Sequence, residues 1–533
     1  MSYRIDEYLG VEFGTSGLRG LASDLTDTVC YASTKAFLQY FLKRESNSES
    51  RSAIELPGKQ TRGKVAVSGD LRSSTNRIIC AANRAILDMG MTPLDCGRFA
   101  TPTLALYAMT QRMPGIMVTG SHIPGDRNGI KFFLPNGEIT KLDERWICSQ
   151  EVEIPDSLFL ETGELRKLMI PLMVNSDRGG AAQEYYSRYL EAFPSGLLAR
   201  MRLGLYEHSA VGSALLGDLY ESLGAEVLRL GRSVEFVPMD TESLSPAVSY
   251  KTVLWSAIYQ LDAVLSTDGD SDRPLVFDEN GQWLCGDVIA ILAAWLLRAE
   301  TVVTPVTTSG ILERSGLFPK IIRTKVGSPY VIKAMQHAIA TGNDRVVGFE
   351  PNGGFLIGTP FSTQWLATEL CLPVPKNATI APLPTRDPAI VHLAVLALAK
   401  LHGVPLSRLV AMLPPCHKLS DRIPNYPTGI SSKMMCQLAA KNGETWPAIN
   451  QVFVKMFGGQ FNTANFVQPV SVDLLDGVRM TFQGGEIIHL RASGNAPEFR
   501  CYVEASSAER SRELLNLTLA AMRAFREQKS LPH

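Results

Sequence analysis

Long apolar runs are absent from this sequence of 533 residues. The two longest, residues 288–297 and 389–401, fall short of the roughly 20 residues that span a bilayer, so we expect buried helices there and no membrane contact. An excess of either charge is absent too, since 52 Lys and Arg stand against 53 Asp and Glu. A composition this balanced gives no sign of a basic surface, so we do not expect nucleic acid as a partner.

Cysteine is scarce as well. The nine cysteines, an odd number, are scattered without a Cys-x-x-Cys pair. This argues against a zinc site or a disulfide framework and favours reduced thiols. The first seven residues also lack the charged-then-apolar layout of a signal peptide. We therefore expect a cytoplasmic protein.

What the sequence does contain is a turn-rich segment, residues 115–131, that gathers reactive side chains. The apolar residues 116–118 predict the end of a buried strand, and the glycines and proline that follow predict a sharp turn. Ser121 would then stand on a loop directly after the strand, where functional groups are common. Together with His122 and Lys131 it offers a hydroxyl, an imidazole and an ammonium group that could all face one phosphate.

Ser121 alone allows other interpretations. The plainest is a loop serine that caps a following helix. A serine-hydrolase elbow is disfavoured, because Ile123 breaks its Gly-x-Ser-x-Gly pattern. A Walker phosphate loop is disfavoured because Gly125 and Lys131 have the wrong spacing.

Two further segments supply charge. The glycine-rich residues 13–20 allow the backbone to wrap closely around an anion. Arg19 adds a guanidinium group, which is always positively charged and can donate two parallel hydrogen bonds. After a later apolar run, Asp268, Asp270 and Asp272 alternate along the chain. Carboxylates this close repel one another unless a cation lies between them. Coordination left open by so few protein ligands suits Mg²⁺.

An EF-hand calcium loop is the main alternative for these aspartates, and Glu279 even occupies its twelfth position. However, Arg273 stands where that loop requires glycine. The flanking residues 263–265 and 275–277 predict strands rather than helices, and an Asn-Gly turn follows them. We therefore expect a metal loop between two strands.

Later loops carry groups suited to a phosphorylated sugar. Lys325 lies in a cationic loop, and Glu350 and Asn352 lie in a glycine-rich turn that could bind sugar hydroxyls. A solvated loop carboxylate is the plain alternative for Glu350. Near the end of the chain a phosphate nest is predicted from the following residues: Arg491, Ser493, Gly494, Asn495 and Arg500.

Strand patterns that alternate with helical patterns predict an α/β chain. We expect four domains, namely residues 1–160, 175–283, 284–410 and 411–533, of which the first three share an α/β rhythm. Residues 43–64 are polar and predict a surface insertion.

In this order and at these separations, the segments resemble those of the α-D-phosphohexomutase family, in particular its bacterial phosphomannomutase/phosphoglucomutase members. The resemblance spans residues 13–504 and is most specific at residues 119–122 and 268–273. It implies three related mixed α/β sandwich domains and a smaller α+β C-terminal domain around a central cleft. It also implies an isomerase that interconverts hexose 6-phosphate and hexose 1-phosphate.

By that resemblance Ser121 carries the phosphoryl group, Mg²⁺ is the cofactor, and a hexose 1,6-bisphosphate is the activator. The implied metal ligands are Ser121, Asp268, Asp270 and Asp272. The implied catalytic residues are Ser121, His122, Lys131, Arg19 and Arg273. The implied substrate-binding residues are Lys325, Glu350, Asn352, Arg491, Ser493, Gly494, Asn495 and Arg500.

Two places depart from the family pattern. Ile123 stands where asparagine is usual, and Asn352 and Gly354 replace the serine and histidine of the sugar loop. The change in the sugar loop slightly disfavours an amino sugar, while mannose, glucose and glucosamine phosphates all stay open, as does the oligomeric state. A catalytically idle sugar-phosphate-binding protein is the alternative from another class, but binding alone needs no nucleophile. A kinase or phosphatase is disfavoured, because no nucleotide loop is present.

Overall fold

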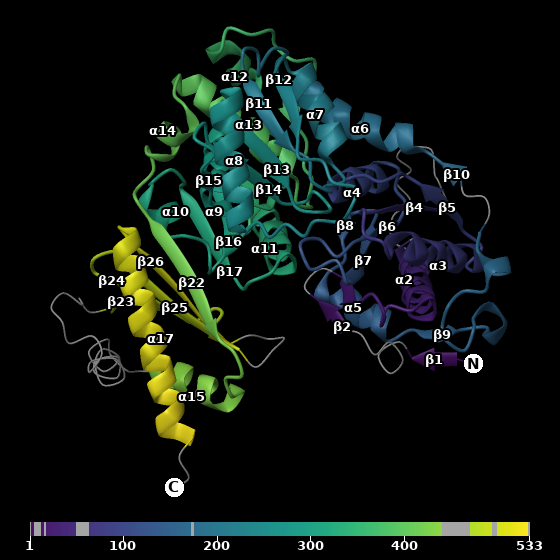
Figure 1. Ribbon diagram of the computed structural model, residues 1–533. Coiled ribbons are helices and arrows are strands. Elements are labelled where there is room, and N and C mark those ends of the chain that lie inside the picture. The colour runs from purple at the N-terminus through teal and green to yellow at the C-terminus, as the bar shows by residue number, and fades with distance from the viewer. Residues whose placement is uncertain are drawn as a thin grey trace. The chain divides into compact units, whose positions relative to one another are not determined.

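The computed structural model describes residues 2–4, 12–14, 17–48, 63–171, 175–439, 469–492 and 498–530 (Figure 1). The chain divides into a larger unit, Met1–Val302 with Met335–Leu409, and a smaller unit, Val303–Ala334 with Val410–His533. Within the described ranges, no helix combines the length and the apolar character needed to cross a membrane.

The larger unit begins with an eight-stranded mixed sheet in the order β10-β5-β4-β6-β7-β3-β2, with β8 paired to β7. Its strands are β2 (Glu12–Gly14), β3 (Gly17–Leu21), β4 (Lys64–Gly69), β5 (Thr92–Asp95), β6 (Gly115–Val118), β7 (Arg127–Leu134), β8 (Gly137–Glu138) and β10 (Asn175–Ser176). The strand β4 is parallel to both β5 and β6, whereas β7 is antiparallel to β6. The carboxyl ends of β4, β5 and β6 therefore meet at one edge of the sheet.

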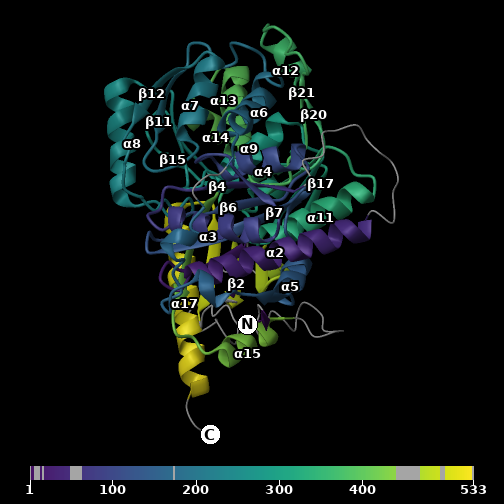
Figure 2. The ribbon, with the colours of Figure 1, turned by 90° about the vertical axis from the view of Figure 1, so that its right-hand side faces the viewer.

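Helices cover both faces of this sheet, because its central strands are apolar on both sides. In β6, Ile116 and Val118 pack into the core with α2 (Asp27–Ser48) and α3 (Thr75–Asp88), which run side by side (Figure 2). Met117 points to the opposite face and packs with α4 (Thr101–Thr110). The remaining elements here are α5 (Lys141–Cys148), α6 (Arg178–Leu190), the 3₁₀ turns Asp156–Leu158 and Lys167–Met169, and the antiparallel pair β1 (Ser2–Arg4) and β9 (Glu151–Glu153).

A second sheet in the larger unit has the order β12-β11-β13-β14-β15. Its elements are β11 (Arg202–Tyr206), α7 (Ser213–Ser222), β12 (Glu226–Leu230), α8 (Pro246–Tyr259), β13 (Ala263–Thr267), β14 (Pro274–Phe277) and β15 (Trp283–Leu284). The strands β11, β12 and β13 are parallel, but β14 is antiparallel to β13. The chain thus reverses within residues 268–273, which are the aspartate loop.

The rest of the larger unit centres on two apolar helices, α9 (Gly286–Leu296) and α13 (Pro388–His402), which pack against each other. The antiparallel strands β18 (Val346–Phe349) and β19 (Phe355–Ile357) enclose the glycine-rich turn that carries Glu350. Smaller elements complete it: β20 (Phe361–Ser362), α12 (Gln364–Glu369), β21 (Thr379–Ile380) and α14 (Leu406–Val410).

The smaller unit has an antiparallel sheet in the order β22-β26-β25-β24-β23. Its strands are β22 (His417–Ile423), β23 (Pro469–Asp473), β24 (Val478–Phe482), β25 (Ile487–Ala492) and β26 (Phe499–Ala505). The helices α15 (Thr428–Leu438) and α17 (Ala508–Ser530) share one apolar core with these strands. Its earlier segment contains most of β16 (Thr301–Pro305), α10 (Ile311–Arg314), β17 (Lys320–Thr324) and the start of α11 (Ser328–Ala340).

The α/β class, with an antiparallel C-terminal sheet covered by helices, is confirmed. The strand before Ser121, the two strands around the aspartate loop and both apolar helices lie where the sequence predicts them. One expectation is partly wrong: α2 continues to Ser48, so the first residues of the predicted surface insertion are helical. The polar side chains of residues 43–46 are exposed on that helix, and the residues from 49 to 62 lie outside the described ranges. The four domain boundaries stay predictions.

Candidate active site

Ser121 lies fully buried on the loop after β6, with a backbone φ of +56°. A residue other than glycine adopts this left-handed conformation at a cost, and such residues cluster at functional sites. The Ser121 N–H donates to Thr119 Oγ1 at 2.7 Å, and Thr119 Oγ1 donates to Asp70 Oδ2 at 2.8 Å. This relay holds the serine in its strained turn.

Arg72 fixes the same loop from beyond the end of β4. Its guanidinium pairs with Asp70 at 3.0 Å and donates to the carbonyl oxygens of Ser121 and Ile123 at 2.9 and 2.6 Å. Gly120 is required beside it, because a Cβ there would lie 2.6 Å from Arg72 Cζ. Neither Asp70 nor Arg72 belongs to a motif that the sequence alone reveals. One feature of the fold could have pointed to Asp70. It follows β4, which is parallel to β6, so Asp70 and Ser121 lie beyond the carboxyl ends of neighbouring strands at the same edge of the sheet.

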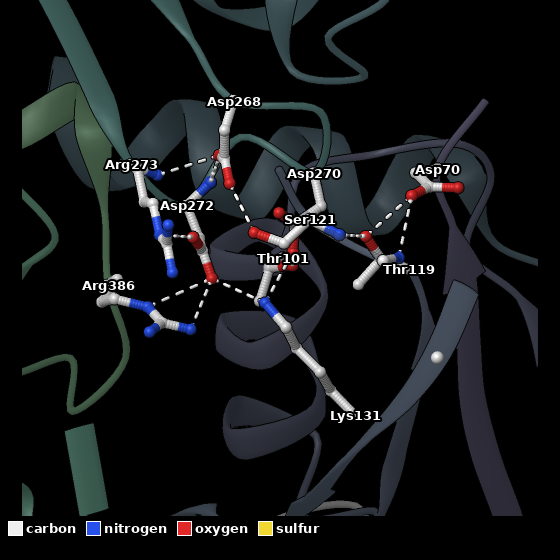
Figure 3. A network of polar contacts seen from close by, with 12 residues as sticks. Asp70, Thr101, Thr119, Ser121, Lys131, Asp268, Asp270, Asp272, Arg273 and Arg386 are labelled. Carbon is white, nitrogen blue, oxygen red and sulfur yellow. Dashed lines mark hydrogen bonds and ion pairs between the residues drawn. The ribbon is translucent and has the colours of Figure 1, made fainter. Parts of the chain in front are cut away.

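Asp268, Asp270 and Asp272 are fully buried, and one carboxylate oxygen of each lies within 4.8 Å of the others (Figure 3). Asp268 Oδ1 accepts the backbone N–H groups of Asp272 and Arg273, each at 3.1 Å, which folds the loop back on itself. Ser121 Oγ donates to Asp268 Oδ2 at 2.6 Å. The fold thus brings the serine loop and the aspartate loop into one site.

Two cations are fixed among the aspartates. Lys131 Nζ, from β7, donates to Asp270 Oδ2 and to Asp272 Oδ2, each at 2.6 Å. Arg386, which lies just before α13, donates to Asp272 Oδ2 at 2.7 Å and to Glu350 Oε2 at 3.0 Å. Arg386 is missing from the residues singled out by sequence. A lone arginine in a proline-rich stretch forms no motif, and only the fold reveals its place.

The charges of the cluster are set by burial and by these cations. Burial, with the charges of Asp270 and Asp272, raises the pKa of Asp268 to about 8. Burial also acts to raise the pKa of Asp270, but the charge and hydrogen bond of Lys131 outweigh it and hold that pKa below its ordinary value. The pKa of Lys131 is raised, because the two carboxylates outweigh the effect of its burial. Lys131 is therefore a fixed positive charge beside an ionised Asp270.

The cluster fits a metal ion. Asp270 Oδ1 and Asp272 Oδ1 are buried, and neither has a hydrogen-bond partner among the described residues. A buried carboxylate oxygen without a donor is costly, and a cation would satisfy it. An all-oxygen ligand set suits a hard divalent cation such as Mg²⁺. Asp268, Asp270 and Asp272 are the residues that could hold it.

Three more of the predicted residues surround the serine. Arg273 Nη1 donates to His122 Nδ1 at 2.9 Å, and Ser121 Oγ lies 3.4 Å from the same nitrogen. Burial, followed by the charges of Arg273 and Arg19, lowers the pKa of His122 to about 2, so its ring is neutral at physiological pH. Burial and then Arg273 lower the pKa of Arg19 to about 10. Positive charges packed this closely favour the binding of a dianionic phosphoryl group beside them.

Glu350 and Asn352 shape the turn between β18 and β19, and both are buried. The Glu350 N–H donates to the Gly354 carbonyl at 3.0 Å, and Asn352 Oδ1 accepts the Gly354 N–H at 2.9 Å. Since Arg386 also contacts Glu350, the turn is tied directly to the aspartate cluster.

The other predicted residues belong to the smaller unit. Lys325 is exposed after β17. The N–H of the next residue, Val326, donates to Asp476 Oδ2 at 3.0 Å, and Asp476 Oδ1 pairs with Arg491 Nε at 3.0 Å. Asp476 therefore ties the Lys325 loop to the strand that carries Arg491, which stands opposite Arg500 on β26. The rest of the predicted phosphate nest, Ser493, Gly494 and Asn495, lies outside the described residues.

A strained, buried serine against a carboxylate cluster, with fixed cations around both, defines a phosphoryl-transfer enzyme on a multidomain α/β fold. Comparisons with known proteins agree. The family model of phosphoglucomutase/phosphomannomutase, alpha/beta/alpha domain I, matches residues 10–153, and that of domain III matches residues 286–416.

Relatives extend the match to the whole chain. A phosphomannomutase of Sinorhizobium fredii is 38% identical over 519 residues, which cover 96% of this chain and 99% of that protein. A phosphomannomutase of Salmonella muenchen is 37% identical over 523 residues, 98% of each chain. The solved structure of a phosphoglucomutase/phosphomannomutase family protein from Burkholderia thailandensis has a TM-score of 0.67 at 18% identity, covering 96% of this chain and 97% of that one. The chain belongs to the phosphoglucomutase/phosphomannomutase family and is a phosphohexomutase, an isomerase by reaction class.

Proposed function

We propose that this enzyme interconverts mannose 6-phosphate and mannose 1-phosphate through a phosphoserine at Ser121 and a hexose 1,6-bisphosphate intermediate. The observation that carries the mechanism is the contact of 2.6 Å between Ser121 Oγ and Asp268 inside a buried aspartate cluster. A protein that only binds sugar phosphates has no use for a nucleophile in that position. The choice of mannose is supported by the two relatives named phosphomannomutase, which match nearly the whole chain.

The reaction has two halves. In the first, the free hydroxyl of a hexose monophosphate attacks the phosphorus of phosphoserine, a new sugar P–O bond forms, and the bond from phosphorus to Ser121 Oγ breaks. The net proton passes from the sugar hydroxyl to Ser121 Oγ. In the second half the bisphosphate presents its other phosphate, and the same bonds are exchanged in reverse. A free hexose 1,6-bisphosphate would act as the activator, because it can rephosphorylate Ser121.

The residues around Ser121 would balance charge during each transfer. Mg²⁺ held by Asp268, Asp270, Asp272 and an oxygen of phosphorylated Ser121 would neutralise the phosphoryl oxygens. Lys131 keeps Asp270 ionised and, with Arg386, fixes the position of Asp272. We assign three further residues to positioning the phosphoryl group through positive charge or hydrogen bonds: Arg19, His122 and Arg273.

The substrate itself would be held at two ends. We assign Glu350 and Asn352 to the sugar hydroxyls, since both are buried in a turn tied to the cluster. The distal phosphate is assigned to Lys325, Arg491, Ser493, Gly494, Asn495 and Arg500. Sugar phosphates as substrates, together with scattered cysteines, support a cytoplasmic location.

The test is turnover together with the site of phosphorylation. Purified enzyme is incubated with mannose 1-phosphate, Mg²⁺ and a trace of hexose 1,6-bisphosphate, and mannose 6-phosphate is followed. Peptide mass spectrometry locates the phosphate, which we expect on Ser121. Parallel rates on glucose and glucosamine phosphates determine the sugar preference. Sugar-phosphate binding without turnover would establish the idle binding protein instead, and an active enzyme phosphorylated elsewhere would remove Ser121 from the mechanism.

A further inference from the structure

A cavity of about 370 Å³ lies in the larger unit between α3, the end of β5 and the start of α6. Its apolar walls include Ile79 and Phe99, and its polar walls are formed by Asn83, Asp95, Arg98 and Arg178. None of the residues assigned above to catalysis, metal or substrate lines it. The volume is in the range of small-molecule sites.

The topology of the sheet favours a ligand at this place. The strands β4 and β5 are adjacent and parallel. The chain leaves β4 for α3 on one face of the sheet, but leaves β5 for α4 on the opposite face. Connections that diverge from neighbouring parallel strands open a crevice at the carboxyl ends, where α/β proteins bind ligands. Val67 near the end of β4 and Gly97 just after β5 both line the cavity, so it occupies that crevice.

The buried side chain of Asn83 lacks a hydrogen-bond donor that a ligand could supply. It lies on α3 with 6% of its surface exposed. Its Oδ1 is buried, and no described residue donates a hydrogen bond to it. Leaving a buried acceptor unpaired costs free energy, and native proteins rarely do so without a reason. A hydroxyl or amine group in the cavity would supply the missing donor.

The charged side chains around the cavity favour an anionic ligand. Arg178 pairs with Asp95 at 2.6 Å, so that carboxylate is already matched. Arg98 donates a hydrogen bond to the neutral Asn76 Oδ1. Burial lowers the pKa of Arg98, and the charge of Arg178 acts in the same direction against the opposing effect of Asp95. Of the two arginines that line the cavity, the partly exposed Arg98 is therefore left without an ion-pair partner of its own among the described residues.

We propose that this cavity binds a small anion with a hydroxyl or amine group next to its charge, such as a hydroxylated phosphate ester or a hydroxy acid. The anionic group pairs with Arg98, and the neighbouring donor satisfies Asn83 Oδ1. The carbon skeleton packs on Ile79 and Phe99. The site is separate from the one that turns over hexose phosphates.

Crystal soaks and calorimetry test this site with three probes. Glycerol 3-phosphate and glycerate carry the two required groups on a phosphate or a carboxylate, and glycerol lacks the charge. We expect density for at least one anion between Asn83 and Arg98. We also expect Asn83→Leu and Arg98→Gln to remove that density and to weaken binding about tenfold or more, as for a lost charge-assisted contact.

Controls keep the outcome interpretable. Arg84→Gln changes an arginine of the same helix outside the cavity and should leave binding unchanged. Circular dichroism of each variant verifies folding, and Arg98→Lys, which keeps the charge, should retain part of the affinity. The proposal is overturned if neither anion enters the cavity of the wild-type protein, or if both variants bind as wild type does. Equal binding of glycerol would overturn the anionic class of ligand.

Discussion

Ser121 Oγ donates a hydrogen bond of 2.6 Å to Asp268 Oδ2, although the two residues are 147 positions apart. The contact joins the loop after β6 to the loop after β13, so each partner is positioned by a different sheet. The loops also meet through their backbones. A Cβ on Gly269 would lie 2.9 Å from the Ser121 carbonyl oxygen, so this position requires glycine. Ser121, the proposed nucleophile, and the carboxylates proposed to bind the metal are thus preorganised as one unit.

Replacement of the nucleophile is the first prediction. Ser121→Ala should reduce mutase turnover on the order of a hundredfold or more, because no other hydroxyl of the described residues donates to the Asp268 carboxylate. The rate is measured by conversion of mannose 1-phosphate, and the phosphopeptide should vanish with it. Ser149→Ala, at an exposed serine after α5, is the matched control and should turn over normally. Near-normal turnover of Ser121→Ala would contradict the phosphoserine mechanism.

Metal dependence is the second prediction. Excess chelator should abolish turnover, and added Mg²⁺ should restore it, because Asp270 Oδ1 and Asp272 Oδ1 are buried without a hydrogen-bond donor among the described residues. Asp270→Asn should raise the Mg²⁺ concentration for half-maximal rate on the order of 10- to 100-fold, since a charged ligand is lost. The exposed Asp240→Asn should leave it unchanged. Full activity in chelator would remove the metal from the mechanism.

Much of the scaffold follows from local sequence. The strand of residues 116–118 and the paired strands around the aspartate loop are short apolar runs bounded by turn residues, and those features are local. The same holds for β24 and β25, which pair as an antiparallel hairpin around a glycine turn. The motifs at Ser121 and Asp268 could be recognised for the same reason, because each is a continuous stretch of sequence.

The rest of the site depends on contacts that no local pattern encodes. Asp70 and Arg72 act through the loop of Ser121, some 50 residues away in sequence, because β4 and β6 are neighbours in the sheet. Arg386 reaches Asp272 across 114 residues. The position where α2 ends could not be predicted for a different reason. The polar residues 43–46 near its end are exposed, and at exposed positions helix and loop compositions look alike.

The third prediction separates recognition of phosphate from recognition of sugar. Arg491→Ala should raise KM for mannose 1-phosphate and glucose 1-phosphate alike, about tenfold or more, because the proposed role of its guanidinium is to bind the phosphate that both share. Glu350→Gln should instead lower kcat and change the ratio of the two sugars, because the proposed role of its carboxylate is to bind the sugar hydroxyls. Arg422→Ala, at an exposed arginine on β22, is the control for Arg491. A changed sugar ratio in Arg491→Ala with unchanged KM would contradict this division.

Acid sensitivity is the fourth prediction. His392 is fully buried in α13, and burial lowers its pKa to about 3, against about 6.5 in an unfolded chain. Below about pH 6.5 the unfolded state takes up a proton that the folded state does not, so stability present above that pH falls as the pH drops toward 3. The contribution is at most about 1.4 kcal/mol per pH unit.

The measurement is the unfolding temperature of the enzyme between pH 7 and pH 4. It should decline less steeply in His392→Gln than in the wild-type protein. His402→Gln removes an exposed histidine at the end of the same helix and should leave the slope unchanged. Parallel slopes for wild type and His392→Gln would mean that His392 has the same pKa in the folded and the unfolded state, which would contradict the prediction.

The last prediction concerns Arg386, which joins the metal cluster to the sugar turn by donating to both Asp272 and Glu350. Its guanidinium is almost fully buried, and although burial acts to lower its pKa, the carboxylates Asp272 and Glu350 hold that pKa well above the ordinary value. A forked side chain can bind two carboxylates at once, whereas an ammonium is a single point charge. Arg386→Lys therefore keeps the positive charge but should not hold both partners in place.

We expect Arg386→Lys to lower kcat on the order of tenfold, to raise the Mg²⁺ requirement through Asp272, and to shift the mannose-to-glucose ratio in the direction of Glu350→Gln. Arg386→Gln should do the same more strongly and should also lower the unfolding temperature, because it leaves buried carboxylates without their partner. Arg345→Lys, at an exposed ion pair with Glu300, should change none of these quantities. If Arg386→Lys lowers stability alone, with the Mg²⁺ requirement and the sugar ratio unchanged, Arg386 supports the fold and does not position the two halves of the site.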